Sequence, residues 1–365
     1  MLSFKRLKAA FKCRSDFPRT ANTNITPTPD LSPSKQFESR LVRNTPPILT
    51  YSGKDSYATW KAEAHSTLIQ LLGITPDLVP EMVNIETLWK AKHKFGDVSK
   101  VQFFDAKSNA IPGYIGTPQN QGSPTRWIIC LQGHTSGMHM SLGLDQAELH
   151  YQEPGYRELD IASQAMRLGY GILCIEQYSL GERSERRLGK IAPHPCQDAA
   201  MHLLLYGHTL MGIRVAEVGR IIDFLLQREL VTGLIGVAGN SLGGTVSMYL
   251  AALYSSIDFA VLSSCISTLK DSILSLYHCT DLYIPQLATY FDSSDILALI
   301  APKPLLMVHG VQDPIFPITG FRNTYNEINK VYTELGVQHR LKPIIGSGGH
   351  KFYGSLAYPA LNVII

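Results

Sequence analysis

The feature that most constrains this chain is a buried-strand pattern that runs directly into Gly-x-Ser-x-Gly and then into a helix pattern. Residues 233–238 read Gly-Leu-Ile-Gly-Val-Ala, residues 239–243 read Gly-Asn-Ser-Leu-Gly, and residues 244–253 are again mostly apolar. A strand-to-helix turn this sharp brings backbone segments close together, so side chains at Gly239 and Gly243 would collide. Such a turn lifts one serine out of the edge of a sheet. Ser241 is therefore the candidate nucleophile.

Composition is typical of a globular protein with a large interior, since 45% of the 365 residues are hydrophobic and 17% are charged. No apolar run reaches the roughly 18 residues of a membrane span. The six cysteines include no Cys-x-x-Cys pair, so neither a zinc motif nor a thioredoxin-type motif is indicated. Cys130, Cys174 and Cys265 lie in strand-like runs, where cysteine usually behaves as a small buried hydrophobe. We expect a reducing compartment and a cytoplasmic protein.

The N-terminus differs from the rest of the chain in charge. Residues 1–43 hold nine Lys and Arg against three Asp and Glu, a formal +6, and the remaining residues sum to −3. We expect residues 1–47 to be a disordered basic tail and linker, because residues 15–47 are rich in Pro, Thr, Ser and Asn. An organellar targeting segment or a contact with an anionic surface stays open. Nothing in the sequence indicates a nucleic-acid enzyme.

A single domain with an N-terminal extension is expected after the tail. Residues 48–98 are expected to form a helical N-terminal extension, with helices over Asp55–Leu72 and Pro80–Lys92. Residues 99–365 alternate apolar strand runs with helix runs, which favours a mostly parallel central sheet flanked by helices on both faces. The expected strands are Val101–Asp105, Ile111–Ile115, Trp127–Leu131, Gly171–Ile175, Leu234–Ala238, Phe259–Leu262, Pro304–Val308 and Leu341–Ile345. The expected helices include Ala162–Leu168, His202–Leu230 and Gly243–Tyr254.

A serine nucleophile needs a base to take its proton and a carboxylate to orient that base. Asp313 follows the Pro304–Val308 strand, where a loop can aim it at the site, although an Asx-type turn before Pro314 is the alternative. His350 stands among glycines after the last strand run, and an imidazole can pass a proton near neutral pH. His309 competes for the role of base, but chain order favours His350.

The oxygen of a tetrahedral intermediate needs backbone N–H donors. Leu242, which follows the nucleophile, is one candidate, and His134, in the loop after Trp127–Leu131, is the other. The His134 side chain could instead be only a wall of the pocket. A metal role for His134 with His139 is not favoured, because no third ligand lies nearby in sequence.

Residues 100–355 resemble the α/β-hydrolase superfamily, and are most similar to the acetyl-xylan-esterase-like and dienelactone-hydrolase-like serine hydrolases. Four stretches carry the resemblance: Leu131-Gln132-Gly133-His134, Gly181-Glu182-Arg183, residues 239–244, and residues 300–306 leading to Asp313-Pro314-Ile315-Phe316-Pro317. The resemblance implies an α/β-hydrolase fold and ester hydrolysis through an acyl-enzyme, with no metal and no organic cofactor. Gln132 stands where many relatives have histidine. Dienelactone hydrolases use a cysteine nucleophile, so Ser241 argues against a dienelactone substrate.

The segment 267–299 is long for a connection and is expected to form a lid-like insertion over the site. His278, Tyr283 and Tyr290 within it could contact a sugar ring or an acyl group, or they could simply pack the segment onto the core. Glu182 and Arg183 could bind a polar group of the substrate, or they could form internal salt bridges.

The leading hypothesis is a serine carboxylesterase that acts on a small-molecule or carbohydrate ester, with acetylated carbohydrate as one candidate. The same three residues could serve a peptidase or amidase. A hydrolase fold used only for binding is the third hypothesis, and it predicts a decayed triad. The sequence does not indicate an oligomeric state.

Overall fold

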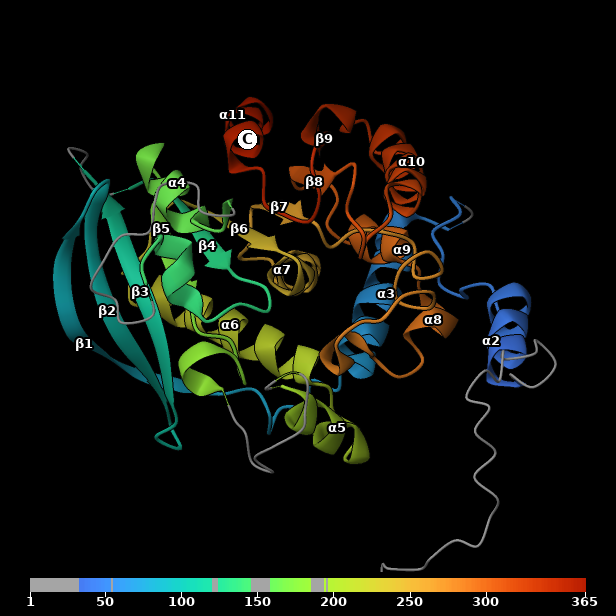
Figure 1. The fold of residues 1–365 in the computed structure, drawn as a ribbon, viewed down its shortest axis with the longest axis horizontal. Helices are drawn as coiled ribbons and strands as arrows, with labels where there is room; N and C mark the ends of the chain where they lie inside the picture. Colours follow the sequence, from blue (N-terminus) through green and yellow to red (C-terminus); the bar gives the residue numbers. More distant parts are fainter. Residues whose placement is uncertain (1–32, 54, 120–123, 146–157, 185–193, 195) are drawn as a thin grey trace, which may run out of the picture. The chain divides into compact units, whose positions relative to one another are not determined.

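The computed structural model describes residues 33–53, 55–119, 124–145, 158–184, 194 and 196–365 (Figure 1). The chain divides into two compact units, residues 1–46 and residues 47–365. In the first unit the described part is helix α2 (Pro33–Asn44), which begins with proline at the first helical position. The expectation of a disordered linker up to residue 47 is therefore wrong for residues 33–44. Residues 1–32 of that expectation lie outside the described residues.

A nine-stranded sheet forms the centre of the second unit, in the order β1-β2-β3-β5-β4-β6-β7-β8-β9. The first three strands and the β3–β5 pair are antiparallel, and every pair from β5 to β9 is parallel. The antiparallel strands form the curved edge at the left of Figure 1. The strands are β1 (Met82–His93), β2 (Gly96–Asp105), β3 (Ala110–Pro118), β4 (Arg126–Leu131), β5 (Gly171–Ile175), β6 (Leu234–Asn240), β7 (Phe259–Ser263), β8 (Leu305–Gly310) and β9 (Leu341–Gly346).

The parallel strands β4 to β8 are buried on both faces, which explains their continuous apolar runs, whereas the edge strand β9 is only partly buried. In β4, Trp127 and Ile129 enter the core on one face, while Ile128 and Cys130 enter the core on the other. Strand β8 alternates in the same way. The first core also contains residues of α3, α6, α7, α9 and α10, and the second contains residues of α4 and α11. These helices are α3 (Tyr57–Leu71), α4 (Ile161–Arg167), α6 (Leu210–Gln227), α7 (Leu242–Leu253), α9 (Ser293–Ala298), α10 (Ile318–Glu334) and α11 (Gly354–Ile364).

One predicted helix is wrong. Residues 80–92 do not form a helix, because Met82–His93 is the edge strand β1, paired antiparallel with β2. Ile85 packs against the first core and Trp89 against the second, because the register shifts between Thr87 and Trp89. Strand pairing therefore overrode the local pattern.

A second predicted helix is two helices. The run His202–Leu230 is divided between α5 (Gln197–Leu205) and α6. Gly207 between them has a φ of +76°, a left-handed conformation that glycine adopts without strain. Thr209 then caps α6 by accepting a hydrogen bond from the Gly212 N–H at 2.9 Å. None of the described helices is both long enough and apolar enough to cross a membrane.

The topology decides where functional side chains can meet. Strands β4, β5, β6, β8 and β9 are parallel, so the residues that follow them lie together at the edge formed by the carboxyl ends of the strands. That edge receives Ser241, Asp313 and His350, together with the loop that begins at Gln132.

We predict that the sheet's two-sided burial dominates its stability. Leu306 in β8 is fully buried, so Leu306→Ala should lower the free energy of unfolding by about 2–5 kcal/mol. Leu205→Ala removes the same atoms from a side chain that is 84% exposed, and it should change stability by less than about 0.5 kcal/mol. Urea unfolding of the two variants measures the difference. Equal destabilisation would contradict the assignment of Leu306 to a packed core.

Candidate active site

Ser241 occupies a strained turn between β6 and α7. Its φ of 57° and ψ of −125° are values that residues other than glycine rarely adopt. A Cβ on Gly239 would overlap the Gly243 carbonyl group, and a Cβ on Gly243 would overlap the Leu131 carbonyl group. The Ser241 N–H donates to the Ser263 carbonyl oxygen at 2.9 Å, which anchors the turn to β7. The steric reason for both glycines, expected from the sequence, is therefore visible in the structure.

Asp313 and His350 are hydrogen-bonded to each other. His350 Nδ1 lies 2.8 Å from Asp313 Oδ2, and the carboxylate side chain is fully buried. The other oxygen, Oδ1, accepts hydrogen bonds from the N–H groups of Ile315 at 2.9 Å and Phe316 at 3.1 Å. Burial opposes ionisation, but the hydrogen bonds from His350 and from the backbone lower the pKa of Asp313. The carboxylate is thus held ionised and aimed at the imidazole.

Backbone contacts join the loops that carry these two residues. The N–H groups of Val311 and Gln312 donate to the carbonyl oxygens of Gly346 and Gly348, each at 2.9 Å. The hydroxyl groups of Ser263 and Ser264 both donate to the Lys351 carbonyl oxygen, at 3.0 and 3.1 Å. These contacts tie the histidine loop to both β7 and the aspartate loop.

The glycines around His350 make room for an aromatic ring. A Cβ on Gly346 would overlap the ring of Tyr353, and the Tyr353 hydroxyl group donates to the Gly349 carbonyl oxygen at 2.8 Å. The glycine-rich loop therefore packs around the ring of Tyr353. This packing fixes the position of His350, which lies in the same loop.

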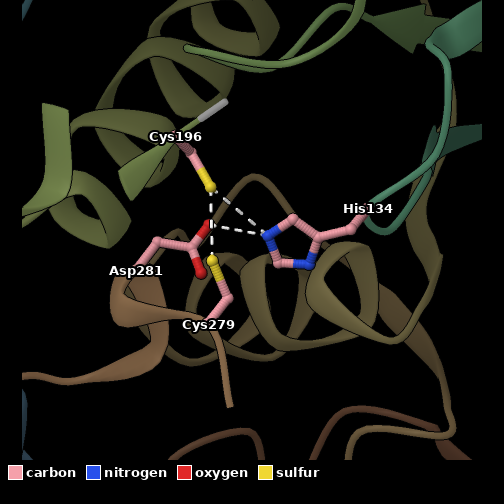
Figure 2. A group of neighbouring side chains, drawn as sticks. All are labelled: His134, Cys196, Cys279 and Asp281. Atoms are coloured by element: carbon pink, nitrogen blue, oxygen red, sulfur yellow. Dashed lines mark hydrogen bonds and ion pairs between the residues drawn. The ribbon is translucent and has the colours of Figure 1, made fainter. Parts of the chain in front are cut away.

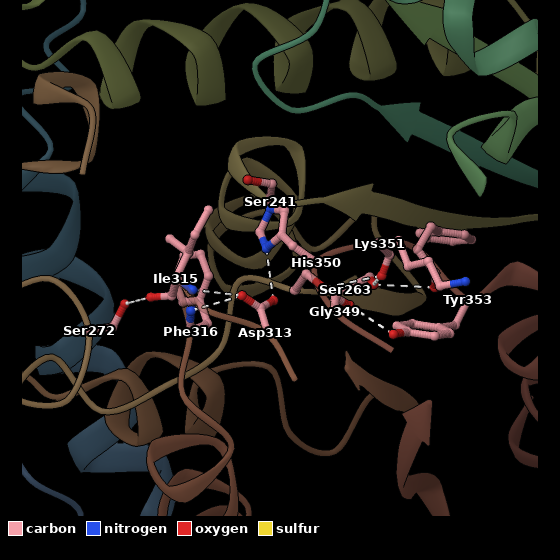
Figure 3. A network of polar contacts seen from close by, with 12 residues as sticks. Ser241, Ser263, Ser272, Asp313, Ile315, Phe316, Gly349, His350, Lys351 and Tyr353 are labelled. Carbon is pink, nitrogen blue, oxygen red and sulfur yellow. Dashed lines mark hydrogen bonds and ion pairs between the residues drawn. The ribbon is translucent and has the colours of Figure 1, made fainter. Parts of the chain in front are cut away.

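Ser241 and His350 meet at the same edge. In Figure 3 the imidazole lies between the Asp313 carboxylate and Ser241, while the Ser241 hydroxyl oxygen points away from the ring. No hydrogen bond joins these two described residues in this conformation. The hydroxyl group instead lies next to the loop after β4. Gly133 in that loop is so close that a Cβ on it would lie 3.5 Å from Ser241 Oγ.

The loop after β4 is held by buried polar side chains. Gln132 Nε2 donates to Glu176 Oε1 at 2.8 Å, and Gln177 Nε2 donates to the Gln132 carbonyl oxygen at 2.6 Å. Glu176 Oε2 also accepts from the Met138 N–H at 3.2 Å. Gln132, Glu176 and Gln177 are almost completely buried. They fix the backbone of Gly133 and His134 beside Ser241.

The abhydrolase family matches residues 40–342 of this chain. The chain belongs to the abhydrolase family. It is 26% identical over 297 residues to the Bacillus subtilis (strain 168) protein named "Putative hydrolase YtaP". The aligned region covers 80% of this chain and 94% of that protein.

Solved structures agree on the fold of this abhydrolase. A "putative acetyl xylan esterase" from Bacteroides fragilis NCTC 9343 is similar with a TM-score of 0.71 and 17% identity, over 87% of this chain and 82% of that one. A glucuronoyl esterase from Solibacter usitatus has a TM-score of 0.59 and 14% identity, over 88% and 97% of the two chains. The predicted α/β-hydrolase fold and superfamily are confirmed.

The candidate substrate residues of segment 267–299 differ in how deeply they are buried and in whether they contact the His350 region. His278 is buried, bonded through Nε2 to Ser272 Oγ at 2.9 Å, and its ring contacts Phe316, which stacks on His350. Burial lowers the pKa of His278, and the neighbouring His350 lowers it further. Tyr283 is exposed, and Tyr290 is half-buried against the core.

Glu182 and Arg183 have intramolecular partners. Arg183 binds both oxygens of Glu217, at 2.7 and 2.8 Å, and Glu182 Oε1 lies 2.9 Å from Lys100 Nζ. The structure therefore contains the internal salt bridges that were the alternative to substrate binding. Neither residue is included in the proposed substrate site. The competing histidine, His309, is fully buried and stacks on Phe321, and burial lowers its pKa to about 4.

Within the segment 267–299, buried contacts are extensive. Asp292 and Asp295 form a capping box at the start of α9, and Asp281 is buried against Arg214 of α6. The Ile48 and Leu49 N–H groups donate to the carbonyl oxygens of Thr289 and Tyr290, each at 3.0 Å. This segment is anchored at several points, and its role as a lid stays a prediction.

Sequence reasoning missed Glu176, Gln177 and Phe316. Glu176 is a charged residue immediately after the buried strand β5, at the edge where a parallel sheet presents functional groups. Its place in the chain was therefore a usable signal. Phe316 lies in a stretch that carries the family resemblance, but nothing in the sequence indicated that its ring would stack on His350.

We predict that Glu176 gives the stability of the protein a distinctive pH dependence. Burial raises the pKa of Glu176 from 4.5 to about 7, although hydrogen bonds from the Met138 and Glu182 N–H groups oppose this. The folded chain then holds this proton more tightly than the unfolded chain. This contribution to stability is fully present below about pH 4.5 and is lost as the pH rises through 7.

The measurement is urea unfolding of the wild type and Glu176→Gln between pH 5 and pH 8. Relative to the variant, the wild type should lose stability on the order of 3 kcal/mol across this window. Parallel curves for the two proteins would show that Glu176 titrates normally.

Proposed function

We propose that this abhydrolase is a serine hydrolase of carboxylic esters that works through an acyl-enzyme intermediate, with Ser241 as nucleophile, His350 as base and Asp313 as the orienting carboxylate. The single observation that carries the proposal is the 2.8 Å contact of Asp313 with His350 at the edge where Ser241 emerges. A buried carboxylate on Nδ1 leaves Nε2 as the nitrogen that can accept a proton.

The first chemical step needs a movement of one side chain. Serine has three staggered positions about its Cα–Cβ bond, and rotation from the present one turns Oγ toward the imidazole. Catalytic hydrogen bonds are often long or absent without substrate and tighten in the complex. Ser241 Oγ then attacks the ester carbonyl carbon while its proton passes to His350 Nε2.

Two N–H groups are proposed to stabilise the oxygen that becomes negative. Leu242 begins α7, so its N–H has no partner within the helix. The His134 N–H belongs to the loop that Glu176 and Gln177 fix beside Ser241. Preorganised donors of this kind lower the barrier because they need no rearrangement during the reaction.

The cycle closes by ordinary acyl transfer. His350 gives its proton to the alcohol as the ester bond breaks, which leaves the acyl group on Ser241. Water, deprotonated by the same imidazole, attacks this acyl-enzyme and releases the carboxylic acid. Asp313 stays ionised throughout and stabilises the imidazolium.

We propose a small or carbohydrate ester, such as an acetylated sugar, as the substrate. Similar folds are named acetyl xylan esterase and glucuronoyl esterase, which supports an ester rather than an amide. His278 and Phe316 beside His350 are the side chains proposed to face the acyl group.

Replacement of the nucleophile is the direct test. Ser241→Ala should reduce the rate of p-nitrophenyl acetate hydrolysis at least about 10³-fold, because the attacking oxygen is lost. Ser255→Ala, at an exposed serine outside the segment 267–299, is the matched control and should retain the wild-type rate. A Ser241→Ala variant that remains folded and as active as the wild type would exclude the proposal. The corresponding anilide, p-nitroacetanilide, should be turned over far more slowly than the ester; the reverse order would favour an amidase.

Asp313 should matter through His350 alone. Asp313→Asn should lower kcat about 10³–10⁴-fold with a much smaller change in KM, because the amide cannot hold the imidazole in its productive tautomer. Asp97→Asn, at an exposed carboxylate, is the control. A large rise in KM with kcat unchanged would instead indicate that Asp313 contacts substrate.

A further inference from the structure

Four side chains with metal-binding atoms converge on the far side of the His134 loop. They are His134 after β4, Cys196 just before α5, and Cys279 and Asp281 in the segment that contains the short 3₁₀ helix at Thr280–Leu282. One ligand atom of each lies within 4.8 Å of the ligand atoms of the other three. Figure 2 shows the imidazole, the two thiols and the carboxylate pointing toward one common centre. These residues come from three separate parts of the chain, so the fold alone brings them together.

The distances fit a tetrahedral zinc ion. Ordinary zinc bond lengths place two sulfurs about 3.8 Å apart, a sulfur and a nitrogen about 3.6 Å apart, and a nitrogen and an oxygen about 3.3 Å apart. Cys196 Sγ lies 3.3 Å from Cys279 Sγ and 3.5 Å from His134 Nε2. His134 Nε2 lies 3.1 Å from Asp281 Oδ2. These three distances are within about half an ångström of the tetrahedral values, and all four ligand atoms lie within 4.8 Å of one another.

The carboxylate also has unused capacity. Asp281 is 2% exposed, and its Oδ1 atom is buried without a hydrogen-bond partner among the described residues. Leaving a buried carboxylate oxygen unsatisfied is costly. Oδ2, by contrast, contacts both His134 and Arg214. The carboxylate could therefore bind a cation through Oδ1, or through Oδ2 in place of its direct contact with His134.

The charge of the surroundings suits a dication held by two thiolates. Zn²⁺ with two thiolates, one carboxylate and a neutral imidazole carries a formal charge of −1. Arg214 is fully buried, and its Nη1 atom lies 2.6 Å from Asp281 Oδ2. The arginine makes the assembly formally neutral, which a buried site requires.

We propose that His134, Cys196, Cys279 and Asp281 bind one Zn²⁺ ion. Soft thiolates with an imidazole are the ligands that select zinc over magnesium or calcium. Four protein ligands leave no open position, so the ion is structural and does not bind substrate. Binding converts both thiols to thiolates and releases their protons to solvent, without any change of oxidation state.

The consequence concerns the loop beside the nucleophile. A zinc ion would fasten the His134 side chain to the start of α5 and to residues 279–281, and so stiffen the backbone whose N–H is proposed to stabilise the oxyanion. Zinc binding does not depend on the proposed ester hydrolysis, because the metal ligands and the triad are different residues.

The test measures metal directly. The full chain is produced in zinc-supplemented medium, purified with a phosphine reductant and without chelator, and analysed for metal by mass spectrometry. We expect about one zinc per chain in the wild type and a large loss in Cys196→Ser and Cys279→Ser. Cys174→Ser replaces a cysteine of β5 that is not part of the cluster, and it should keep the zinc. Ser241→Ala should also keep the zinc while losing esterase activity, which separates the two proposals.

A second readout covers variants that fail to fold. Wild-type protein stripped of metal and given Co²⁺ should develop the visible absorption of tetrahedral cobalt with thiolate ligands, and Zn²⁺ should abolish it. Less than about 0.1 zinc per chain together with no cobalt spectrum would overturn the proposal. Unchanged zinc in both cysteine variants would also overturn it. So would a metal-free wild type whose Cys196 and Cys279 are joined in a disulfide.

Discussion

The close approach of α7 to β4 is the contact on which the rest of the candidate site depends. Gly243, in the first turn of α7, lies so near the Leu131 carbonyl group that any side chain would overlap it. This contact sets the angle of the turn, gives Ser241 its positive φ, and places Gly133 against the serine. The proposed nucleophile and the proposed oxyanion loop are thus positioned by one packing contact, before any polar interaction is considered.

Hydrogen bonds to two buried carboxylates then fix the loops of the candidate site. Asp313 satisfies both of its oxygens, with two backbone N–H groups on one and His350 on the other. Glu176 likewise accepts hydrogen bonds on both oxygens, from the Gln132 side-chain amide and from the Met138 N–H, and so holds the loop after β4. Each carboxylate is buried, and each orients a neighbouring group rather than facing solvent. The candidate site is therefore preorganised except at the Ser241 hydroxyl group, whose rotation is a small movement.

Much of this could be predicted from the sequence, for definite physical reasons. Strands buried on both faces leave continuous apolar runs, so β4 to β8 were identifiable, and the confirmed fold places the residues that follow β6, β8 and β9 at one edge. The catalytic roles of Ser241, Asp313 and His350 remain proposals. Strand β1 was mistaken for a helix because its pairing with β2, and the irregularity between Thr87 and Trp89, are invisible in a local pattern.

The histidine, cysteine and aspartate cluster could not be predicted, for a different reason. Its members are separated by many tens of residues, and no pair has the short spacing of a zinc motif except Cys279 and Asp281, which are two apart. Only the packing of the segment 267–299 against α5, α6 and the His134 loop brings them together. A charged pair buried at Arg214 and Asp281 gave no sequence signal either.

The central claim is that the Ser241 hydroxyl group is a nucleophile activated by His350. Reaction with a fluorophosphonate, followed by peptide mass spectrometry, measures this directly because the reagent phosphonylates an activated serine. The account predicts one adduct, on the peptide that contains Ser241, and a strong loss of labelling in His350→Ala. A folded wild-type protein that acquires no adduct at Ser241, or that is labelled equally when His350 is replaced, would contradict it.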